Sequence, residues 1–159
     1  MHVVLAAFLL ATSFDVTRSL RLTAAAEQLF ETEKKMVTTS AEPIEDLLFA
    51  DVLSLLDVAI ETNPANLHAR ALRSQILLLH SYDGQGAYDV CDLLDARSDA
   101  DFVLRRAARA AAGDVATART VLRGIERIPP DAVPDPPSDC DDDSENGTRT
   151  RHVLVRSSH

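Results

Sequence analysis

Aromatic residues are scarce in this chain, and their scarcity argues against a protein built from β-sheets. Aromatic side chains make up 4% of the 159 residues and tryptophan is absent, although 46% of all residues are hydrophobic. Alanine and leucine supply most of that apolar content, and both favour helices, whereas sheets rely on aromatic and β-branched side chains. The length is sufficient for one domain with a hydrophobic core. The composition therefore predicts a globular, all-α protein.

Cysteine is also scarce, because Cys91 and Cys140 are too few to form a disulfide framework. Cys91 falls within an apolar helical pattern, and Cys140 falls within a segment that we expect to be disordered. We therefore predict one buried thiol and one exposed thiol, a combination that suits a reducing compartment. A disulfide between the two cysteines is the alternative.

Basic residues are too few for a typical nucleic-acid-binding surface. The chain has 16 basic and 25 acidic residues and a net charge of −9, the opposite balance to that of proteins that bind phosphate backbones. Much of the acid lies near the C-terminus, so the rest of the chain is closer to neutral. We expect no nucleic-acid partner.

Residue patterns that would indicate catalysis or metal binding are missing as well. The five histidines include no pair with the i, i+4 spacing of metal ligands on one helix, and the chain has no HExxH, CxxC or GxSxG motif. Gly84-Gln85-Gly86 lacks the downstream Gly-Lys-Ser/Thr of a phosphate-binding loop. We therefore predict no enzyme activity, no metal site and no cofactor.

The apolar N-terminal segment, residues 1–18, has two interpretations. Residues 3–11 form a continuous apolar run with the length of a signal-peptide core, and Ala11-Thr12-Ser13 is an acceptable cleavage site. No Lys or Arg precedes the run, however, so the segment can also be a first helix that packs on the core. The run is too short to span a membrane as a helix, and we expect no stable span.

Between residues 19 and 130, apolar residues recur at helical spacing, and prolines fall outside the helix interiors. The patterns predict five to six helices, over residues 19–37, 43–61, 66–80, 87–97, 98–112 and 114–128. Asn66 is the expected N-cap of the third helix, Ser98 with Asp101 that of the fifth, and Gly113 ends the fifth. The fourth helix is expected to place Val90, Cys91 and Leu94 inward and Asp89, Asp92 and Asp95 outward. Residues 131–159 are rich in acid and proline and predict a disordered tail.

The order of helices and turns resembles the tetratricopeptide (TPR) repeat. The segment Ala59-Ile60-Glu61-Thr62-Asn63-Pro64-Ala65-Asn66 looks like the end of one unit, with a small residue and then a proline five positions later. Further on, Gly113-Asp114 matches the turn between paired helices, Ala118 the small position and Pro130 the closing proline. The aromatic and glycine positions of the first helix are not matched, and Asp99 replaces the closing proline of the middle unit.

The resemblance covers roughly residues 43–130 and implies antiparallel helix-turn-helix pairs in a right-handed stack. It also implies a protein that binds other proteins in a groove between helices. An ordinary bundle of five or six helices is the alternative interpretation of the same pattern.

Arginines are the candidate binding residues. In a TPR-like stack, the third and fifth helices would line the same concave groove, where bidentate hydrogen bonds could hold an acidic peptide. The residues are Arg70 and Arg73 on the third helix, and Arg105, Arg106 and Arg109 on the fifth. Their alternative role is to form the solvated faces of amphipathic helices.

Three functions remain open at this point. The first is a cytoplasmic adaptor or scaffold that binds a protein or peptide, and the second is a secreted, periplasmic or envelope-associated structural protein. The third is a small enzyme with a pocket between helices, which no cluster of acids and bases supports. A homo-oligomer is a further expectation, because terminal repeats without a polar cap expose an apolar face.

Overall fold

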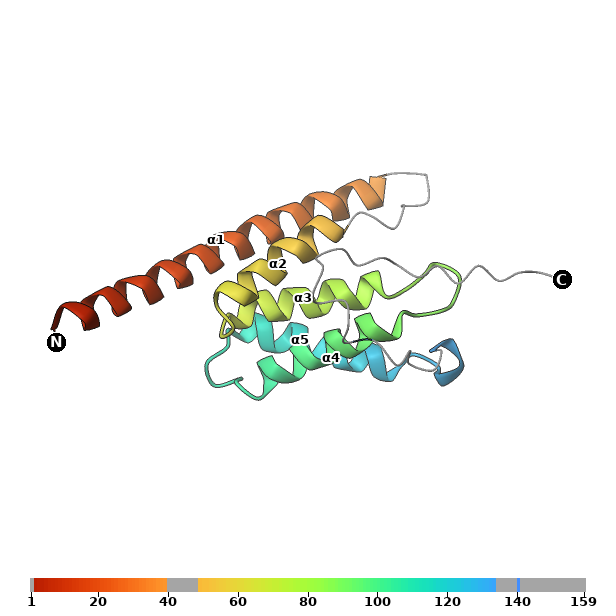
Figure 1. Ribbon diagram of the computed structural model, residues 1–159. Helices are drawn as coiled ribbons and strands as arrows, with labels where there is room; N and C mark the ends of the chain where they lie inside the picture. The colour runs from red at the N-terminus through yellow and green to blue at the C-terminus, as the bar shows by residue number, and fades with distance from the viewer. Residues whose placement is uncertain (1, 40–48, 134–139, 141–159) are drawn as a thin grey trace.

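The computed structural model describes residues 2–39, 49–133 and 140, and this part of the chain is all-helical (Figure 1). It contains five α-helices and a short 3₁₀ turn: α1 (His2–Thr39), α2 (Ala50–Thr62), α3 (Leu67–His80), α4 (Val90–Leu104), α5 (Ala112–Glu126) and η1 (Pro130–Ala132). The predicted fold class is therefore confirmed. Most of the predicted disordered tail, residues 134–139 and 141–159, lies outside the described residues. Among the helices described, none is long and apolar enough to cross a membrane.

The N-terminal segment and the first predicted helix form one long helix. The sequence predicts an apolar segment over residues 1–18 and a separate helix over residues 19–37. In the structure, α1 runs through both without a break. Its buried side chains include Ser19, Thr23, Ala26 and Phe30, which recur at helical spacing along one side. This side packs against α2, which runs antiparallel to α1 (Figure 1). The predicted start of the second helix at Pro43 lies outside the described residues.

The third helix has the predicted bounds and the predicted cap. Asn66 has extended backbone angles, and its Oδ1 accepts a hydrogen bond from Ala69 N at 3.0 Å. The turn after α3 requires glycine twice, because Gly84 and Gly86 have φ angles of 76° and 105°. Asp83 closes this turn by accepting hydrogen bonds from two backbone N–H groups of the turn, and these bonds lower the pKa of its carboxyl.

The predicted boundary between the fourth and fifth helices at Ser98 is wrong. Helix α4 runs through this position to Leu104, and no separate helix covers residues 98–112. The reason is that the buried side of α4 continues at i, i+3, i+7 and i+10 across the boundary, while Ser98 is exposed on the other side. The residues of that buried side are Leu93, Ala96, Ala100 and Val103.

Helix α5 begins earlier than predicted. Its N-cap is Ala111, so Gly113 lies in its first turn and does not end a preceding helix. Asp114 is also within this first turn, where an acidic side chain is favoured by the helix dipole. The inward face through Ala118 and Val121 is as predicted, and Pro129 follows the helix end. Gly124 allows α5 to approach α3 closely, since a Cβ there would lie 2.8 Å from Leu78 Cδ2.

The first turns of α4 depart from the predicted inward and outward sides. Leu94, predicted inward, is 50% exposed, and Asp92, predicted outward, is 4% exposed. Asp92 is buried because its Oδ2 lies 2.6 Å from His80 Nδ1 at the end of α3. The pair links the two ends of the α3–α4 turn, and the sequence alone did not pair these residues.

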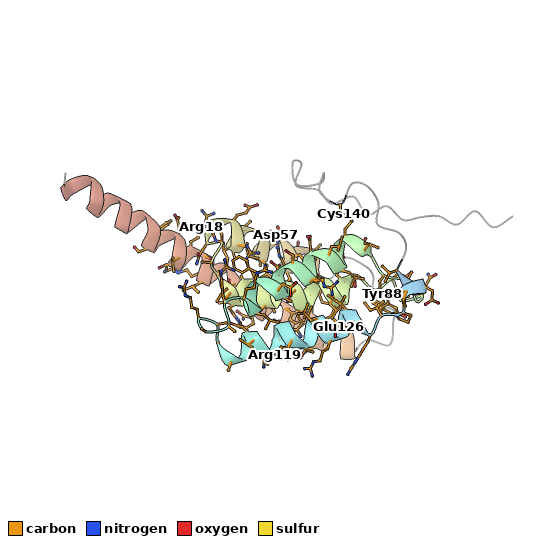
Figure 2. All side chains as sticks on the ribbon, turned by 90° about the horizontal axis from the view of Figure 1, so that it is seen from below. Arg18, Asp57, Tyr88, Arg119, Glu126 and Cys140 are labelled. Carbon is orange, nitrogen blue, oxygen red and sulfur yellow. A yellow bond between two sulfur atoms is a disulfide. The ribbon has the colours of Figure 1, made fainter. Side chains whose placement is uncertain are left out.

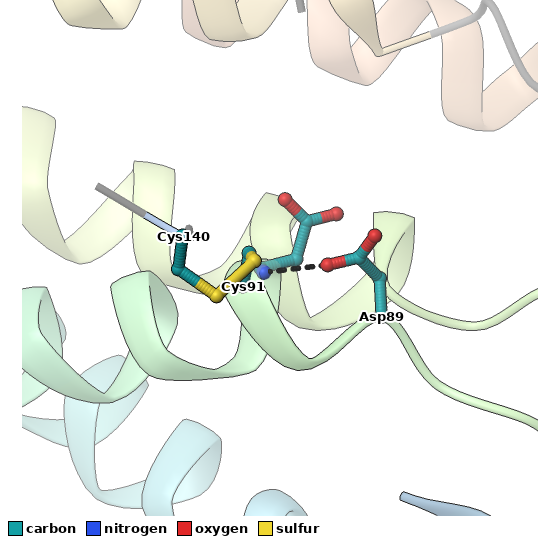
Figure 3. The surroundings of a disulfide bond; sticks show 4 residues. Asp89, Cys91 and Cys140 are labelled. Atoms are coloured by element: carbon teal, nitrogen blue, oxygen red, sulfur yellow. Dashed lines mark hydrogen bonds between the residues drawn. A yellow bond between two sulfur atoms is a disulfide. The ribbon is translucent and has the colours of Figure 1, made fainter. Parts of the chain in front are cut away.

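The prediction of two free thiols is also wrong, because Cys91 and Cys140 form a disulfide with Cα atoms 5.4 Å apart (Figure 3). The chain returns to the start of α4 after α5: Tyr88 N donates a hydrogen bond to Ala132 O at 3.1 Å. Only seven residues then separate Ala132 from Cys140. Sequence reasoning assigned Cys140 to a free tail because this return depends on tertiary contacts.

Candidate functional site at one end of the bundle

The five predicted binding arginines fall into two groups with different surroundings. Arg70 Nη1 and Arg73 Nε each donate to one carboxylate oxygen of Asp99, both at 2.6 Å. Arg73 also pairs with Asp57. Asp99 is 1% exposed and lies on α4, so these contacts join α3 to α4 within the bundle.

The pKa of Arg73 is raised by this arrangement. Burial opposes the charge, but hydrogen bonds and charges of Asp99 and Asp57 outweigh that effect. Arg70 and Arg73 are therefore both committed to an internal ion-pair network, and neither offers a free guanidinium to a partner.

The other group, Arg105, Arg106 and Arg109, lies on the connection between α4 and α5, and all three are exposed. Within the described part of the chain, none of them lies in an ion pair. Arg106 stacks its guanidinium on the ring of Phe102, 3.6 Å from the centroid, and this cation–π contact fixes its direction. These arginines can therefore meet an anion without giving up an ion pair with a described residue.

A hollow of about 340 Å³ lies beside this connection. It is formed where three segments of the chain meet: α1 at Leu20, the α2–α3 turn with the start of α3, and the α4–α5 connection with the start of α5. Arg106 and Arg109 line it, whereas Arg105 does not. Its lining is Leu20, Asn63, Ala65, Asn66, Leu67, His68, Arg106, Arg109, Ala110, Ala111 and Asp114. The hollow thus combines two arginines with an apolar surface, and it also contains the paired side chains of His68 and Asp114.

A buried hydrogen-bond network holds the hollow in shape. Asn66 Nδ2 donates to Ser19 Oγ at 2.8 Å and to Thr23 Oγ1 at 2.9 Å, and Ser19 Oγ donates to Ala59 O at 2.6 Å. All three side chains are buried, so the bonds form in a medium of low dielectric where they strongly favour one geometry. The network fixes α1, the end of α2 and the start of α3 relative to one another.

Sequence reasoning missed this network, although one signal for it exists. Ser19 and Thr23 are polar residues at i, i+4 on the same side of α1 as Ala26 and Phe30. A polar pair on an otherwise apolar helix side needs a hydrogen-bonding partner from another element. The identity of that partner, Asn66, is not visible before folding.

His68 links the hollow to two carboxylates. Its Nδ1 lies 2.7 Å from Asp114 Oδ1 on α5, and its Nε2 lies 3.5 Å from Glu27 Oε2 on α1. Burial lowers the pKa of His68, but the hydrogen bonds and charges of Asp114 and Glu27 raise it by more, so its pKa is above the ordinary value. The ring is 45% exposed, which weakens these interactions by solvent screening.

We expect the stability contribution of His68 to fall as pH rises. The pKa of His68 is higher in the folded than in the unfolded chain, so its contribution is fully present below the unfolded pKa of about 6.5 and is lost as pH rises through the folded value. This contribution is measured by comparing the melting temperatures of the native chain and of His68→Gln at pH 6 and at pH 8. The difference between the two proteins should be larger at pH 6, and an equal difference at both pH values would contradict this assignment.

A buried carboxyl on α1 also lies away from the hollow. Glu33 on α1 is 6% exposed, and its Oε2 makes no hydrogen bond to any residue that the structure describes. Burial raises its pKa, and repulsion from Asp51 raises it further. Among the residues that the structure describes, no group of three or more His, Cys, Asp and Glu side chains is placed to hold a metal ion. Glu33 and Asp51 therefore do not define a metal centre.

Comparisons with protein-family models, with curated proteins and with solved structures found no match to this chain. The resemblance to TPR repeats therefore stays a prediction from the sequence.

Proposed function

We propose that this chain is a protein-interaction module that binds an acidic segment of a partner protein at the hollow. The observation that carries the proposal is the pair Arg106 and Arg109, which line the hollow and have no carboxylate partner among the described residues. An arginine guanidinium binds a carboxylate through two parallel hydrogen bonds, which gives both attraction and orientation. Arg105 lies on the same connection and adds positive charge close by.

The apolar part of the lining supports a peptide ligand over a simple ion. Leu20 is 53% exposed and lies at the hollow beside Leu67 and Ala110. An acidic segment that also carries an apolar side chain would cover this surface while its carboxylate meets Arg106 or Arg109. Because the Asn66 network already fixes α1, the end of α2 and the start of α3, these sides of the hollow need little further ordering when a ligand binds.

The TPR-like interpretation belongs to the same proposal. Successive helices run in opposite directions (Figure 1), and α3 packs against both α4 and α5. This arrangement is compatible with two helix-turn-helix units, α1–α2 and α3–α4, followed by α5. Gly113-Asp114, which the resemblance assigns to the turn between paired helices, lies instead in the first turn of α5. The proposed hollow lies at the end of the bundle, near the turns, and involves the α4–α5 connection where sequence reasoning placed a helix.

A second candidate function, a secreted or envelope-associated protein, is favoured by the disulfide. Disulfides form and persist in oxidising compartments and are rare in the cytosol. The bond between Cys91 and Cys140 therefore supports a secreted or periplasmic location over a cytoplasmic one. This location is compatible with an interaction module, so the two proposals can both hold.

Reversal of the charges at the hollow tests the proposed function. With the full chain as bait for proteins of its native source, Arg106→Glu/Arg109→Glu should reduce affinity for a captured partner at least about tenfold, because each charge-assisted hydrogen bond contributes about 1.5–3 kcal/mol. Arg105→Glu alone should have a smaller effect, since Arg105 does not line the hollow.

Arg119→Glu/Arg123→Glu is the matched control, because both residues are exposed on α5 and neither lines the hollow. Figure 2 shows Arg119 on the outer side of this helix. The control should retain the partner. A partner that binds equally well to the Arg106→Glu/Arg109→Glu variant would remove the hollow as its binding site.

A further inference from the structure

The first part of α1 extends away from the rest of the bundle. Among the α1 side chains that the structure describes, those from Ser13 to Arg18 are all exposed, and Ser19 is the first that is buried. Two of them are large and apolar: Phe14 is 67% exposed and Val16 is 43% exposed. Figure 1 shows α1 continuing past the ends of the other helices toward the N-terminus. An apolar helix in this position requires an apolar environment from outside the described chain.

The composition of the extension indicates what kind of environment fits it. Residues 3–14 (VVLAAFLLATSF) contain no charged residue, and only Thr12 and Ser13 are polar. A helix that docks in a protein groove needs one apolar face, whereas a helix that is apolar all round needs apolar surroundings on every side. The hydrocarbon of a lipid bilayer provides such surroundings, and the groove of one partner protein does not.

The length of the extension limits how deeply it can enter a bilayer. Twelve residues of α-helix span about 18 Å, whereas the hydrocarbon core of a bilayer is about 30 Å thick. The extension can therefore reach into one leaflet but not through the membrane. This agrees with the finding that no described helix is suited to crossing a membrane.

Two arginines follow the apolar residues along α1. Arg18 and Arg21 are both exposed, and Asp15 is the only acidic residue between residue 2 and Arg21. Figure 2 shows Arg18 at the point where the extension leaves the bundle. Long basic side chains in such a position reach lipid phosphates while their stems cover apolar surface. Positive charge near the headgroups strengthens binding to membranes that carry anionic phospholipids.

We propose that residues 3–14 of α1 insert into one leaflet of a membrane containing anionic phospholipids, with Arg18 and Arg21 binding the headgroup phosphates. The helical body is thereby held at the membrane surface. This site is separate from the hollow, and it does not depend on the acidic partner proposed there.

Sedimentation of the full chain with phospholipid vesicles tests the proposal. The vesicles contain equal parts of phosphatidylcholine and phosphatidylglycerol, and the native chain should sediment with them. Phe8→Asp/Leu9→Asp should lower the partition coefficient about a hundredfold or more, because a charged residue within hydrocarbon costs about 2.5–3.5 kcal/mol. The matched control, Ala24→Asp/Ala25→Asp, adds the same charge to exposed positions of α1 beside the bundle and should retain most of the binding.

The contribution of Arg18 and Arg21 is tested separately. Arg18→Gln/Arg21→Gln should weaken binding to these vesicles roughly thirtyfold, which is about fivefold for each basic residue near an anionic surface. The same variant should bind vesicles of pure phosphatidylcholine as the native chain does. Thermal melting of each variant shows that the bundle remains folded, so a loss of sedimentation cannot be attributed to unfolding.

Four outcomes overturn the proposal. The first is a native chain that does not sediment with vesicles, and the second is a Phe8→Asp/Leu9→Asp variant that sediments as well as the native chain. The third is self-association that the same variant abolishes in the absence of lipid, which identifies a second copy of the chain as the occupant. The fourth is protein from the native source that begins beyond Phe14, which identifies the segment as a cleaved leader.

Discussion

Replacing Asp99 by alanine should lower the free energy of unfolding by about 3–5 kcal/mol, the cost of breaking a buried ion pair from one side. Asp99 is almost completely buried and accepts hydrogen bonds from both Arg70 and Arg73. Without Asp99, two guanidinium groups that are 16% and 21% exposed lose their shared partner, and each retains its desolvation cost. The expected loss is a large fraction of the total stability of a typical domain.

Urea denaturation followed by circular dichroism measures this loss, and Asp57→Ala is the matched control. Asp57 binds the same Arg73, but its side chain is 50% exposed, so its removal should cost less than about 1 kcal/mol. Asp99→Asn keeps the shape of the side chain and some of its hydrogen bonds. Its loss in the free energy of unfolding should therefore lie between those of Asp99→Ala and Asp57→Ala. Equal destabilisation by Asp99→Ala and Asp57→Ala would show that burial does not determine the strength of this network.

The Asp99 network also explains why one helix boundary could not be predicted. Ser98 followed by Asp101 is a local capping pattern, and local reasoning places a helix start there. In the folded chain, Asp99 is held by side chains 29 and 26 residues earlier in the sequence, and the buried side of α4 continues through the position. Tertiary contacts therefore decide in favour of one continuous helix. By contrast, the cap at Asn66 makes a bond to a residue three positions away, and α3 was predicted with the correct bounds.

In the candidate site, too, the sequence shows which residues are close in the chain but not which distant residues they contact. The sequence identified Arg105, Arg106 and Arg109 as a basic cluster, because they are close in the chain. It also grouped Arg70 and Arg73 with them, because a TPR-like stack would place the third and fifth helices along one groove. No sequence pattern indicates that Asp99 binds both Arg70 and Arg73. Which arginines are left available is a property of the packed helices, and only the structure separates the two groups.

Removing the disulfide by Cys140→Ser should lower the free energy of unfolding by about 2–4 kcal/mol. The bond joins positions 49 residues apart, and a loop of this length removes about 4 kcal/mol of chain entropy from the unfolded state in the simplest treatment. Residues 92–104 and 112–126 of this loop are already ordered in α4 and α5, so the bond acts mainly by restricting the unfolded chain. A thiol reductant should lower the melting temperature of the native chain to that of Cys140→Ser and leave the variant itself unchanged. Alkylation under denaturing conditions, followed by mass spectrometry, counts the free thiols directly. Two free thiols in protein purified without reductant would contradict the bridge.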